Sequence, residues 1–324
     1  MKAAYIEKVG PEDSFIYSDV PDPKIGPNQV LIRVKAAAIN RADLTRRQGT
    51  YGGNAPPSFP FVFGWEVAGV IEAIGPEVTD RKVGQRVVAT TAYGGYAELL
   101  AVNRNGTVPL PDNLSFEVGA SIPIVFLTSW YGLLKVGRIG AGESVLIQSG
   151  GSGVGMAGIQ IAKYFGCKVI TTAGSAEKVA KARQFGADLA INYQEEDFLP
   201  AVMGFTDGRG VDVVLESVGG DVLTKSIQAF APLGRLVIVG NSSNSATQPD
   251  LKLLWRKNVS VCSFSMSLQM SYGRVMPELA KIMELCSQGK MKTGVDRVFP
   301  LKEASAAHRY VGERRNFGKV IRIP

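Results

Sequence analysis

The glycines of "SGGSGVG", residues 149–155, are the residues whose spacing points most directly to chemistry. They follow the apolar run "SVLIQ" and precede the helical pattern "GMAGIQIAK". Glycines let a backbone turn sharply and approach a pyrophosphate, whose charge then meets free N–H groups at a helix start. Ser152 replaces the middle glycine of a GxGxxG pattern, yet the strand, loop and helix context still indicates dinucleotide binding. We therefore expect contacts to a cofactor from Gly150, Ser152, Gly153 and Val154.

The type of dinucleotide depends on the end of the next strand, which reads "VITTAGSAEK" at 169–178. NAD is usually held there by an Asp or Glu on the ribose 2′-hydroxyl. No acid occurs before Glu177, and Gly174, Ser175 and Lys178 instead offer an amide, a hydroxyl and a cation to a 2′-phosphate. Taken alone, Lys178 would be interpreted as a solvated helix residue, but together with the missing acid it makes NADPH the expected cofactor.

A single carboxylate, Glu66, interrupts the apolar run "FVFGWEVAGV" at 61–70. It could be a catalytic or metal-binding group, a structural carboxylate hydrogen-bonded to backbone, or a solvent-facing residue of a strand. The chain has one histidine, His308, and three cysteines far apart in sequence, which suggests neither metal-ligand spacing nor a disulfide framework. We expect a cytoplasmic protein, because the first residues lack an apolar signal core and free cysteines suit a reducing compartment.

The elements that must position these residues differ along the chain, because the spacing of apolar residues changes from a strand-like pattern to alternating strand-like and helix-like patterns. Residues 1 to about 119 contain short β-type runs divided by Pro and Gly, which favours a mostly antiparallel domain. From about 120 to 261 apolar strands alternate with helical patterns, which predicts a parallel sheet covered by helices. A helix and a final strand, "GKVIRIP", then return to the first domain. The longest uncharged stretches are broken by Pro or Gly, so we expect no membrane insertion.

Several motifs in order along the chain resemble those of the medium-chain dehydrogenase/reductase superfamily. They are "INRADLTRRQGTYG" at 39–52, "GWEVAGVIEAIG" at 64–75 and the glycine loop, and the similarity runs nearly end to end. Within this superfamily, "NRADL", "RQG" and "TAGSAEK" most resemble the zinc-free NADPH:quinone oxidoreductase, ζ-crystallin-like branch. The resemblance implies an α/β fold, with a GroES-like substrate domain at 1–119 and 262–324 and an inserted Rossmann NADPH-binding domain at 120–261.

The resemblance also provides a test for zinc. The zinc alcohol dehydrogenases of the superfamily carry a Cys where this chain has Asn40 and a His where it has Trp65, and neither replacement is a zinc ligand here. We expect no metal, so Glu66 is better interpreted as a buried carboxylate hydrogen-bonded to backbone or a polar partner. His308 is expected to be a surface or helix-capping residue. Without a metal, oxidation of an alcohol is poorly supported, whereas reduction of a quinone or enone needs only a hydride donor and hydrogen bonds to oxygen.

The candidate catalytic residues are Asn40, Asp43 and Tyr51. Asp43 could equally be a helix N-cap, and Tyr51 could pack on Pro56 and Pro57. The three arginines of 41–47 are expected to be solvated. The resemblance implies further cofactor contacts from Asn40 and from residues spread over the rest of the chain: Thr128, Tyr193, Ser217, Val218, Gly240, Asn241, Phe264, Ser265 and Lys319.

Two further functions stay open. The same fold and cofactor would serve a 2-alkenal or enoyl-thioester reductase, and ζ-crystallin-like proteins include structural and RNA-binding members. The net charge of +7 permits a nucleic-acid partner, but the basic residues form no stripe with interleaved aromatics, so we expect none. The apolar strand "VSVCSFSM" at 259–266 is expected to pair with its copy in another subunit and give a homodimer.

Overall fold

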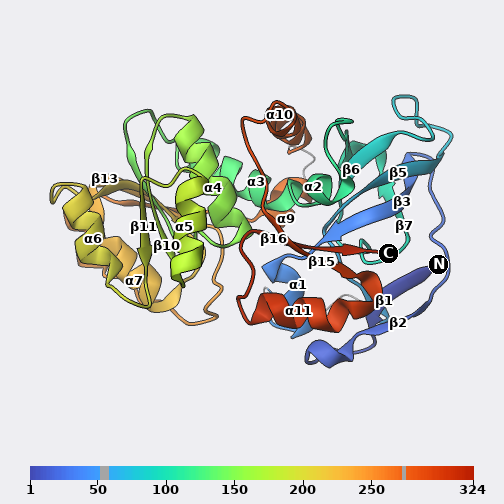
Figure 1. Cartoon of the computed structure of the whole chain (residues 1–324), viewed down its shortest axis with the longest axis horizontal. Helices are drawn as coiled ribbons and strands as arrows, with labels where there is room; N and C mark the ends of the chain where they lie inside the picture. The colour runs from blue at the N-terminus through green and yellow to red at the C-terminus, as the bar shows by residue number, and fades with distance from the viewer. Residues whose placement is uncertain (52–57, 272–274) are drawn as a thin grey trace. The chain divides into compact units, whose positions relative to one another are not determined.

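The computed structural model describes residues 1–51, 58–271 and 275–324, and its Cα packing divides the chain into two compact units (Figure 1). Unit 1 comprises Met1–Ile124, Gln269–Gly289 and Thr293–Pro324. Unit 2 comprises Val125–Leu268 and Lys290–Lys292. Most of unit 2 is thus formed by the middle of the chain, and most of the residues after Leu268 return to unit 1.

Unit 2 is built on a parallel sheet of six strands in the order β11-β10-β9-β12-β13-β14. The strands are β9 (Ser144–Ile147), β10 (Lys168–Ala173), β11 (Leu189–Asn192), β12 (Val211–Glu216), β13 (Phe230–Ile238) and β14 (Ser260–Ser263). Successive strands add outward from β9 on one side and from β12 on the other. This is the strand order of the Rossmann fold. In that fold, ligands bind beyond the carboxyl ends of the strands, near the place where the direction of strand addition reverses, which here lies between β9 and β12.

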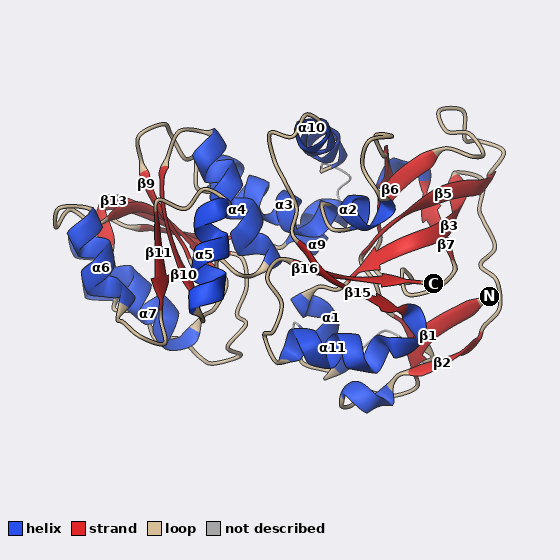
Figure 2. Cartoon of the chain, in the orientation of Figure 1, coloured by secondary structure: helices blue, strands red, loops and turns tan. Residues whose placement is uncertain are grey.

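In unit 2 helices lie beside the strands (Figure 2), and the sequence pattern predicted those that follow β9, β10 and β12. The helices are α3 (Pro123–Trp130), α4 (Gly153–Tyr164), α5 (Ala176–Gln184), α6 (Phe198–Phe205), α7 (Gly220–Gln228), α8 (Leu251–Lys257) and α9 (Met266–Ser271), with a π-helical turn at Tyr131–Val136. α3 and α9 cross the boundary between the units. The core strands β9 and β12 are almost fully buried, since helices cover a parallel sheet on both faces.

Unit 1 is β-rich. Its larger sheet has the order β15-β16-β3-β5-β6-β8, with β7 also paired to β3, and its smaller sheet has the order β2-β1-β4. The strands are β1 (Lys2–Ile6), β2 (Ile16–Asp19), β3 (Gln29–Ala38), β4 (Phe61–Val62), β5 (Glu66–Ile74), β6 (Arg86–Thr90), β7 (Leu99–Asn103), β8 (Thr107–Pro109), β15 (Val295–Pro300) and β16 (Lys319–Ile323). All pairs are antiparallel except β15 with β16, so the prediction of a mostly antiparallel domain is confirmed.

Two features of the large sheet position the site. The C-terminal strand β16 pairs with the end of β3, where Ile321 lies opposite Ala38, so the predicted return of the chain to its first domain is confirmed. Gly69 of β5 lies so close to β3 that an added Cβ would be 2.2 Å from the Arg33 carbonyl oxygen. A glycine is therefore required where β5 crosses the irregular middle of β3. The helices of this unit are α1 (Arg41–Arg47), α2 (Phe116–Ala120), α10 (Met276–Ser287) and α11 (Ala304–Gly312).

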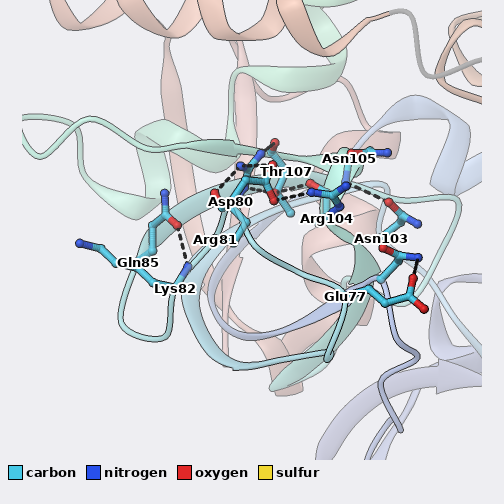
Figure 3. Close-up of polar contacts among 10 residues, drawn as sticks. Glu77, Asp80, Arg81, Lys82, Gln85, Asn103, Arg104, Asn105 and Thr107 are labelled. Carbon is cyan, nitrogen blue, oxygen red and sulfur yellow. Dashed lines mark hydrogen bonds and ion pairs between the residues drawn. The ribbon is translucent and has the colours of Figure 1, made fainter.

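A polar cluster fixes the turns between the outer strands of this sheet (Figure 3). The Arg81 guanidinium donates to the hydroxyl of Thr107 at 2.9 Å and to its carbonyl oxygen at 3.0 Å. Asp80 accepts hydrogen bonds from both Arg81 and Arg104. The cluster ties the turn after β5 to the segment between β7 and β8, and we interpret it as structural.

None of the helices in the described part of the chain has the length and apolar composition of a membrane span.

Candidate active site

The glycine loop lies at the carboxyl end of the central strand β9. Ser152 is the N-cap of α4, where its Oγ accepts a hydrogen bond from the Gly155 N–H at 2.9 Å. An added Cβ would lie 2.1 Å from the Ser149 carbonyl oxygen at Gly155 and 2.3 Å from Thr171 Oγ1 at Gly150. These glycines are thus required by close packing of strand, loop and helix. The first N–H groups of α4 have no partner within the helix, so they are suited to an anion.

Helix α3 contacts this loop, because Ser129 Oγ donates to the Val154 carbonyl oxygen at 2.7 Å. Its neighbour Thr128 is 7% exposed. The bond fixes the start of α4 relative to the helix that carries Thr128.

A second set of polar groups lies just beyond the carboxyl end of β10. Ser175 is the N-cap of α5 and its Oγ accepts from the Lys178 N–H at 3.3 Å. Tyr193, which follows β11, lies directly against Gly174, where an added Cβ would be 2.5 Å from the phenol oxygen. The tertiary structure therefore adds Tyr193 to the group that the sequence analysis formed from Gly174, Ser175 and Lys178. The first acid after the strand, Glu177, forms an ion pair with Lys181 at 2.8 Å.

Glu216, whose role the sequence did not reveal, closes the loop that follows β12. Its buried carboxylate accepts from the N–H groups of Val218 at 2.6 Å and Gly219 at 3.1 Å, and Ser226 Oγ lies 3.3 Å away. Burial raises the pKa of Glu216, and the two backbone N–H groups partly oppose that effect. The carboxylate thus holds the backbone of Val218 and Gly219 in place.

The remaining candidates of unit 2 also follow strand ends. Gly240 and Asn241 come after β13, and the Asn241 amide donates to the Ser245 carbonyl oxygen at 3.0 Å. Phe264 and Ser265 come directly after β14. All the candidates of unit 2 except Thr128 therefore lie at or just beyond the carboxyl ends of the parallel strands or at the helix starts that follow them. This is the edge at which ligands bind in this architecture.

In unit 1 the end of β3, the start of β5 and the start of β16 bring together Asn40, Glu66 and Lys319. The Lys319 ammonium donates to the Ile39 carbonyl oxygen at 2.8 Å, to Asn40 Oδ1 at 2.7 Å and to Glu66 Oε1 at 2.8 Å. Asn40 Nδ2 donates to the same Glu66 oxygen at 2.8 Å. The other oxygen, Oε2, accepts the Ile124 N–H at 2.7 Å. The interpretation of Glu66 as a buried, hydrogen-bonded carboxylate is confirmed.

Lys319 has protein partners for all three of its ammonium protons and is 2% exposed. Its contact with a cofactor stays a prediction. The structure instead shows a direct contact between its ammonium and the Asn40 amide.

Asp43 lies beneath this group as the third residue of α1. Its Oδ2 accepts from the Asn40 backbone N–H and from the Tyr96 hydroxyl, both at 2.9 Å. Asn40, not Asp43, is the N-cap, so the alternative assignment of Asp43 as the cap is wrong, although Asp43 does supply the return bond of a capping box. Burial raises the pKa of Asp43 to about 6, against the hydrogen bonds from Asn40 and Tyr96.

Tyr51 lies just after α1 and packs edge-on against Trp65, with ring centroids 5.6 Å apart. The Arg46 guanidinium lies 4.8 Å from the centroid of each of these rings. Pro56 and Pro57, the other packing partners considered for Tyr51, lie outside the described residues. Tyr51 is thus held by an aromatic and cationic stack, and Trp65, where zinc dehydrogenases carry a histidine, is part of that stack.

Two expectations for charged residues of unit 1 are wrong. His308 is on the predicted C-terminal helix, α11, but it is fully buried against the rings of Phe15, Phe63 and Tyr96. Arg47, expected to be solvated, is also fully buried and pairs with Glu12 at 2.8 Å. Both residues are buried because Leu44 of α1 and Ala304 and Ala307 of α11 pack into the apolar core of unit 1, which local charge does not reveal.

Two residues escaped the sequence analysis altogether. Tyr96 lies between Asp43 and the buried Arg322, and its ring stacks with the Arg322 guanidinium. No local pattern marks either residue, because each sits in an ordinary β-type run. Within the described ranges 1–51, 58–271 and 275–324, no group of three or more His, Cys, Asp or Glu residues is arranged to hold a metal ion.

Comparison with known proteins agrees with this arrangement. The family model of the alcohol dehydrogenase GroES-like domain matches residues 26–112, and that of the zinc-binding dehydrogenases matches 153–281. The chain is 34% identical to a quinone oxidoreductase of Pseudomonas aeruginosa, and the match covers 95% of each. It also matches polyketide synthases from Aureobasidium melanogenum and Mycobacterium tuberculosis, but it spans only 14% of their length.

Solved structures show the same fold over the whole chain. The Escherichia coli quinone oxidoreductase complexed with NADPH is 31% identical, with a TM-score of 0.93 and 100% of each chain covered. The CurK enoyl reductase is 29% identical, with a TM-score of 0.90 and coverage of 99% of this chain and 98% of that one.

A Rossmann sheet with a glycine loop and a β-rich GroES-like unit together define a dehydrogenase/reductase fold. The chain belongs to the medium-chain dehydrogenase/reductase superfamily and, within it, to the quinone oxidoreductase branch.

Proposed function

We propose that this protein is an NADPH-dependent, zinc-independent reductase that transfers hydride to quinones or related conjugated carbonyls. The observation that carries the proposal is the end of β10, where Gly174, Ser175, Lys178 and Tyr193 gather and the first acid is paired with Lys181. A site of this composition favours the 2′-phosphate of NADPH over the free hydroxyl of NADH, because Glu177, the only acid between β10 and Lys178, is paired with Lys181. The NADPH-bound quinone oxidoreductase among the structural relatives supports the same cofactor.

The start of α4 offers N–H groups to the pyrophosphate of this cofactor, and close packing at Gly150 and Gly155 holds the loop in place. In this proposal, residues 120–261 bind NADPH and residues 1–119 and 262–324 bind the substrate. When bound, NADPH supplies a hydride, and with one proton from solvent this reduces a quinone by two electrons or saturates an activated double bond.

Zinc independence is supported by what surrounds Asn40. The ammonium of Lys319 lies 2.7 Å from Asn40 Oδ1 and 2.8 Å from Glu66 Oε1. A cation of the protein thus already neutralises the Glu66 carboxylate, which accepts a hydrogen bond from the Asn40 side-chain amide, and Trp65 offers no imidazole. The chain's contribution to the reaction is then to orient the substrate and to donate hydrogen bonds to the oxygen that gains charge, for which Asn40, Asp43 and Tyr51 remain the proposed residues.

The second candidate function is reduction of a 2-alkenal or an enoyl thioester, which the likeness to the CurK enoyl reductase favours. The two candidates share fold, cofactor and hydride chemistry, so only the acceptor separates them. An RNA-binding or structural role is the alternative of another class, and a steep salt dependence of RNA binding at submicromolar concentrations would revive it.

The test is oxidation of NADPH and of NADH by the purified protein after exhaustive chelation. The acceptors are 1,4-benzoquinone, 1,4-naphthoquinone, a 2-alkenal, an enoyl thioester and a simple aldehyde. We expect turnover with NADPH and the quinones that chelation leaves unchanged. Loss of all turnover on chelation would refute zinc independence, and selective use of the thioester would establish the second candidate.

We also propose a cytoplasmic homodimer. The edge strand β14 of the parallel sheet has β13 as its only strand partner in the described chain, and Val261 within it is 50% exposed. An exposed apolar edge of this kind can be covered by the same strand of a second copy. Equilibrium sedimentation that finds only monomer would exclude this assembly.

A further inference from the structure

The buried group formed by Asn40, Glu66 and Lys319 leaves one hydrogen-bonding donor unused. The Lys319 ammonium donates its three protons to the Ile39 carbonyl oxygen, Asn40 Oδ1 and Glu66 Oε1. Each carboxylate oxygen of Glu66 accepts at least one hydrogen bond. Among the described residues, only the second N–H of the Asn40 amide has no acceptor. Asn40 is also the most exposed of the three, at 8%, against 2% for Lys319 and 0% for Glu66.

The neighbours of Asn40 determine which end of its amide is available. An ammonium can only donate, so Lys319 requires the amide oxygen on its side. A carboxylate can only accept, so Glu66 requires the amide nitrogen on its side. A flipped amide would place two donors together and two acceptors together in a site that water scarcely reaches. Lys319 and Glu66 together therefore exclude the flipped orientation of the Asn40 amide. The group of that amide left without a partner is then the second N–H of Nδ2.

We propose that Glu66 and Lys319 are positioning residues that hold the Asn40 amide as a donor to a carbonyl oxygen. This inference rests on the proposed function, because it assigns the acceptor as the oxygen of the reducible carbonyl or of the nicotinamide carboxamide. The ammonium withdraws electron density through the amide oxygen and strengthens the N–H as a donor, as chains of hydrogen bonds do in a low dielectric. A donor already oriented in this way stabilises negative charge on an oxygen without reorganisation.

The test is a double-mutant cycle on activity. Asn40→Ala removes the donor, and we expect kcat/KM for the quinone or for NADPH to fall about 100-fold, as for the loss of an oxyanion donor. Asn40→Asp keeps the shape but has no N–H, so it should be at least as impaired. The combined change Glu66→Gln with Lys319→Met removes both charges together and frees the amide to flip, and we expect a fall of about 10-fold.

The decisive comparison is the combined change made in the Asn40→Ala background. If the pair acts through Asn40, kcat/KM there should fall less than about twofold further. A second fall of about 10-fold would show a merely structural role and overturn the inference. The matched control is Glu143→Gln with Arg235→Met, which removes a partly buried ion pair of unit 2 and should leave kcat/KM unchanged in both backgrounds.

Direct titration with NADPH identifies the acceptor. Weaker NADPH binding in Asn40→Ala assigns the donor to the carboxamide, whereas unchanged binding with a lower kcat/KM for the quinone assigns it to the substrate carbonyl. No change in either quantity for Asn40→Ala contradicts the inference while the wild-type protein still reduces quinones. Failure of the proposed function itself is distinct, since the wild-type protein would then reduce none of the acceptors.

Discussion

The Nζ atom of Lys319 lies 2.8 Å from Oε1 of Glu66, and the two side chains are 3% and 0% exposed. An ion pair removed from water in this way tolerates the loss of both charges far better than the loss of one. The relationship therefore has consequences for stability that are separate from its role next to Asn40.

Lys319→Met alone should lower the free energy of unfolding by about 3–5 kcal/mol, because it leaves the Glu66 carboxylate buried and uncompensated. Adding Glu66→Gln should restore most of that loss. The measurement is urea unfolding at pH 7 followed by circular dichroism. Equal losses in the single and the combined variant would contradict the argument from charge. The exposed pair Lys2–Asp19 provides the control, and Lys2→Met should shift the urea midpoint far less.

Asp43 predicts a pH dependence of stability. Its pKa is raised from 3.8 to about 6 in the folded protein, so between these values the folded state holds a proton that the unfolded state has lost. Stability contributed by this residue is therefore complete below about pH 4 and is lost as the pH rises through about 6. Asp43→Asn should remove this dependence. Its stability relative to wild type should rise by roughly 2 kcal/mol between about pH 4.5 and 7 in urea titrations. A constant difference across that range would show that the carboxyl does not titrate there.

His308 predicts the opposite slope. Burial among aromatic rings, with Arg322 and Arg47 nearby, holds the pKa of His308 well below 6.5. The unfolded state then binds a proton that the folded state does not, so stability is lost as the pH falls below about 6.5. His308→Phe should keep the contact with Phe15 and remove this loss. Thermal unfolding at pH 5 and pH 7.5 should show a gain relative to wild type at the lower pH, and a gain of equal size at both values would exclude titration as the cause.

The glycine loop offers a matched pair of substitutions. Gly155→Ala places a Cβ 2.1 Å from the Ser149 carbonyl oxygen, so the loop must move and NADPH binding should weaken more than 10-fold. Gly204→Ala, inside α6, meets nothing within 4 Å and should leave binding unchanged while slightly raising the melting temperature. Fluorescence titration with NADPH compares the two. Equal affinity in both variants would show that the loop does not bind the pyrophosphate.

Lys178 tests the preference for NADPH. Lys178→Ala should reduce affinity for NADPH about 10- to 100-fold, as expected for a lost charged hydrogen bond, and should change affinity for NADH little. The control is Lys168→Ala at the opposite end of β10, where neither cofactor should be affected. An equal loss for NADPH and NADH would remove Lys178 as the basis of the preference.

The sequence by itself determined whatever depends on local or periodic patterns. The βα repeat from 120 to 261 specified the parallel sheet, since strands and helices bury their apolar faces with different periods. The glycine loop and the missing acid after "VITTA" are contiguous features, so the sequence alone was enough to predict an NADPH site there. The return of "GKVIRIP" to the first domain was also readable, as an apolar strand that needs a partner.

Only the tertiary structure decided the partners of the buried charges. Glu66 and Lys319 are 253 residues apart, and they meet because β16 and β5 both pair with β3. Asp43 and Tyr96 are 53 apart and are joined by helix α1 packing over the sheets. A charged residue is stable in a core only when a partner reaches it. Strand pairing between segments far apart in the sequence determines which partner that is, and the residues next to the charge in the sequence do not reveal it. For the same reason the sequence predicted a surface or helix-capping position for His308, whereas the structure places it in the core.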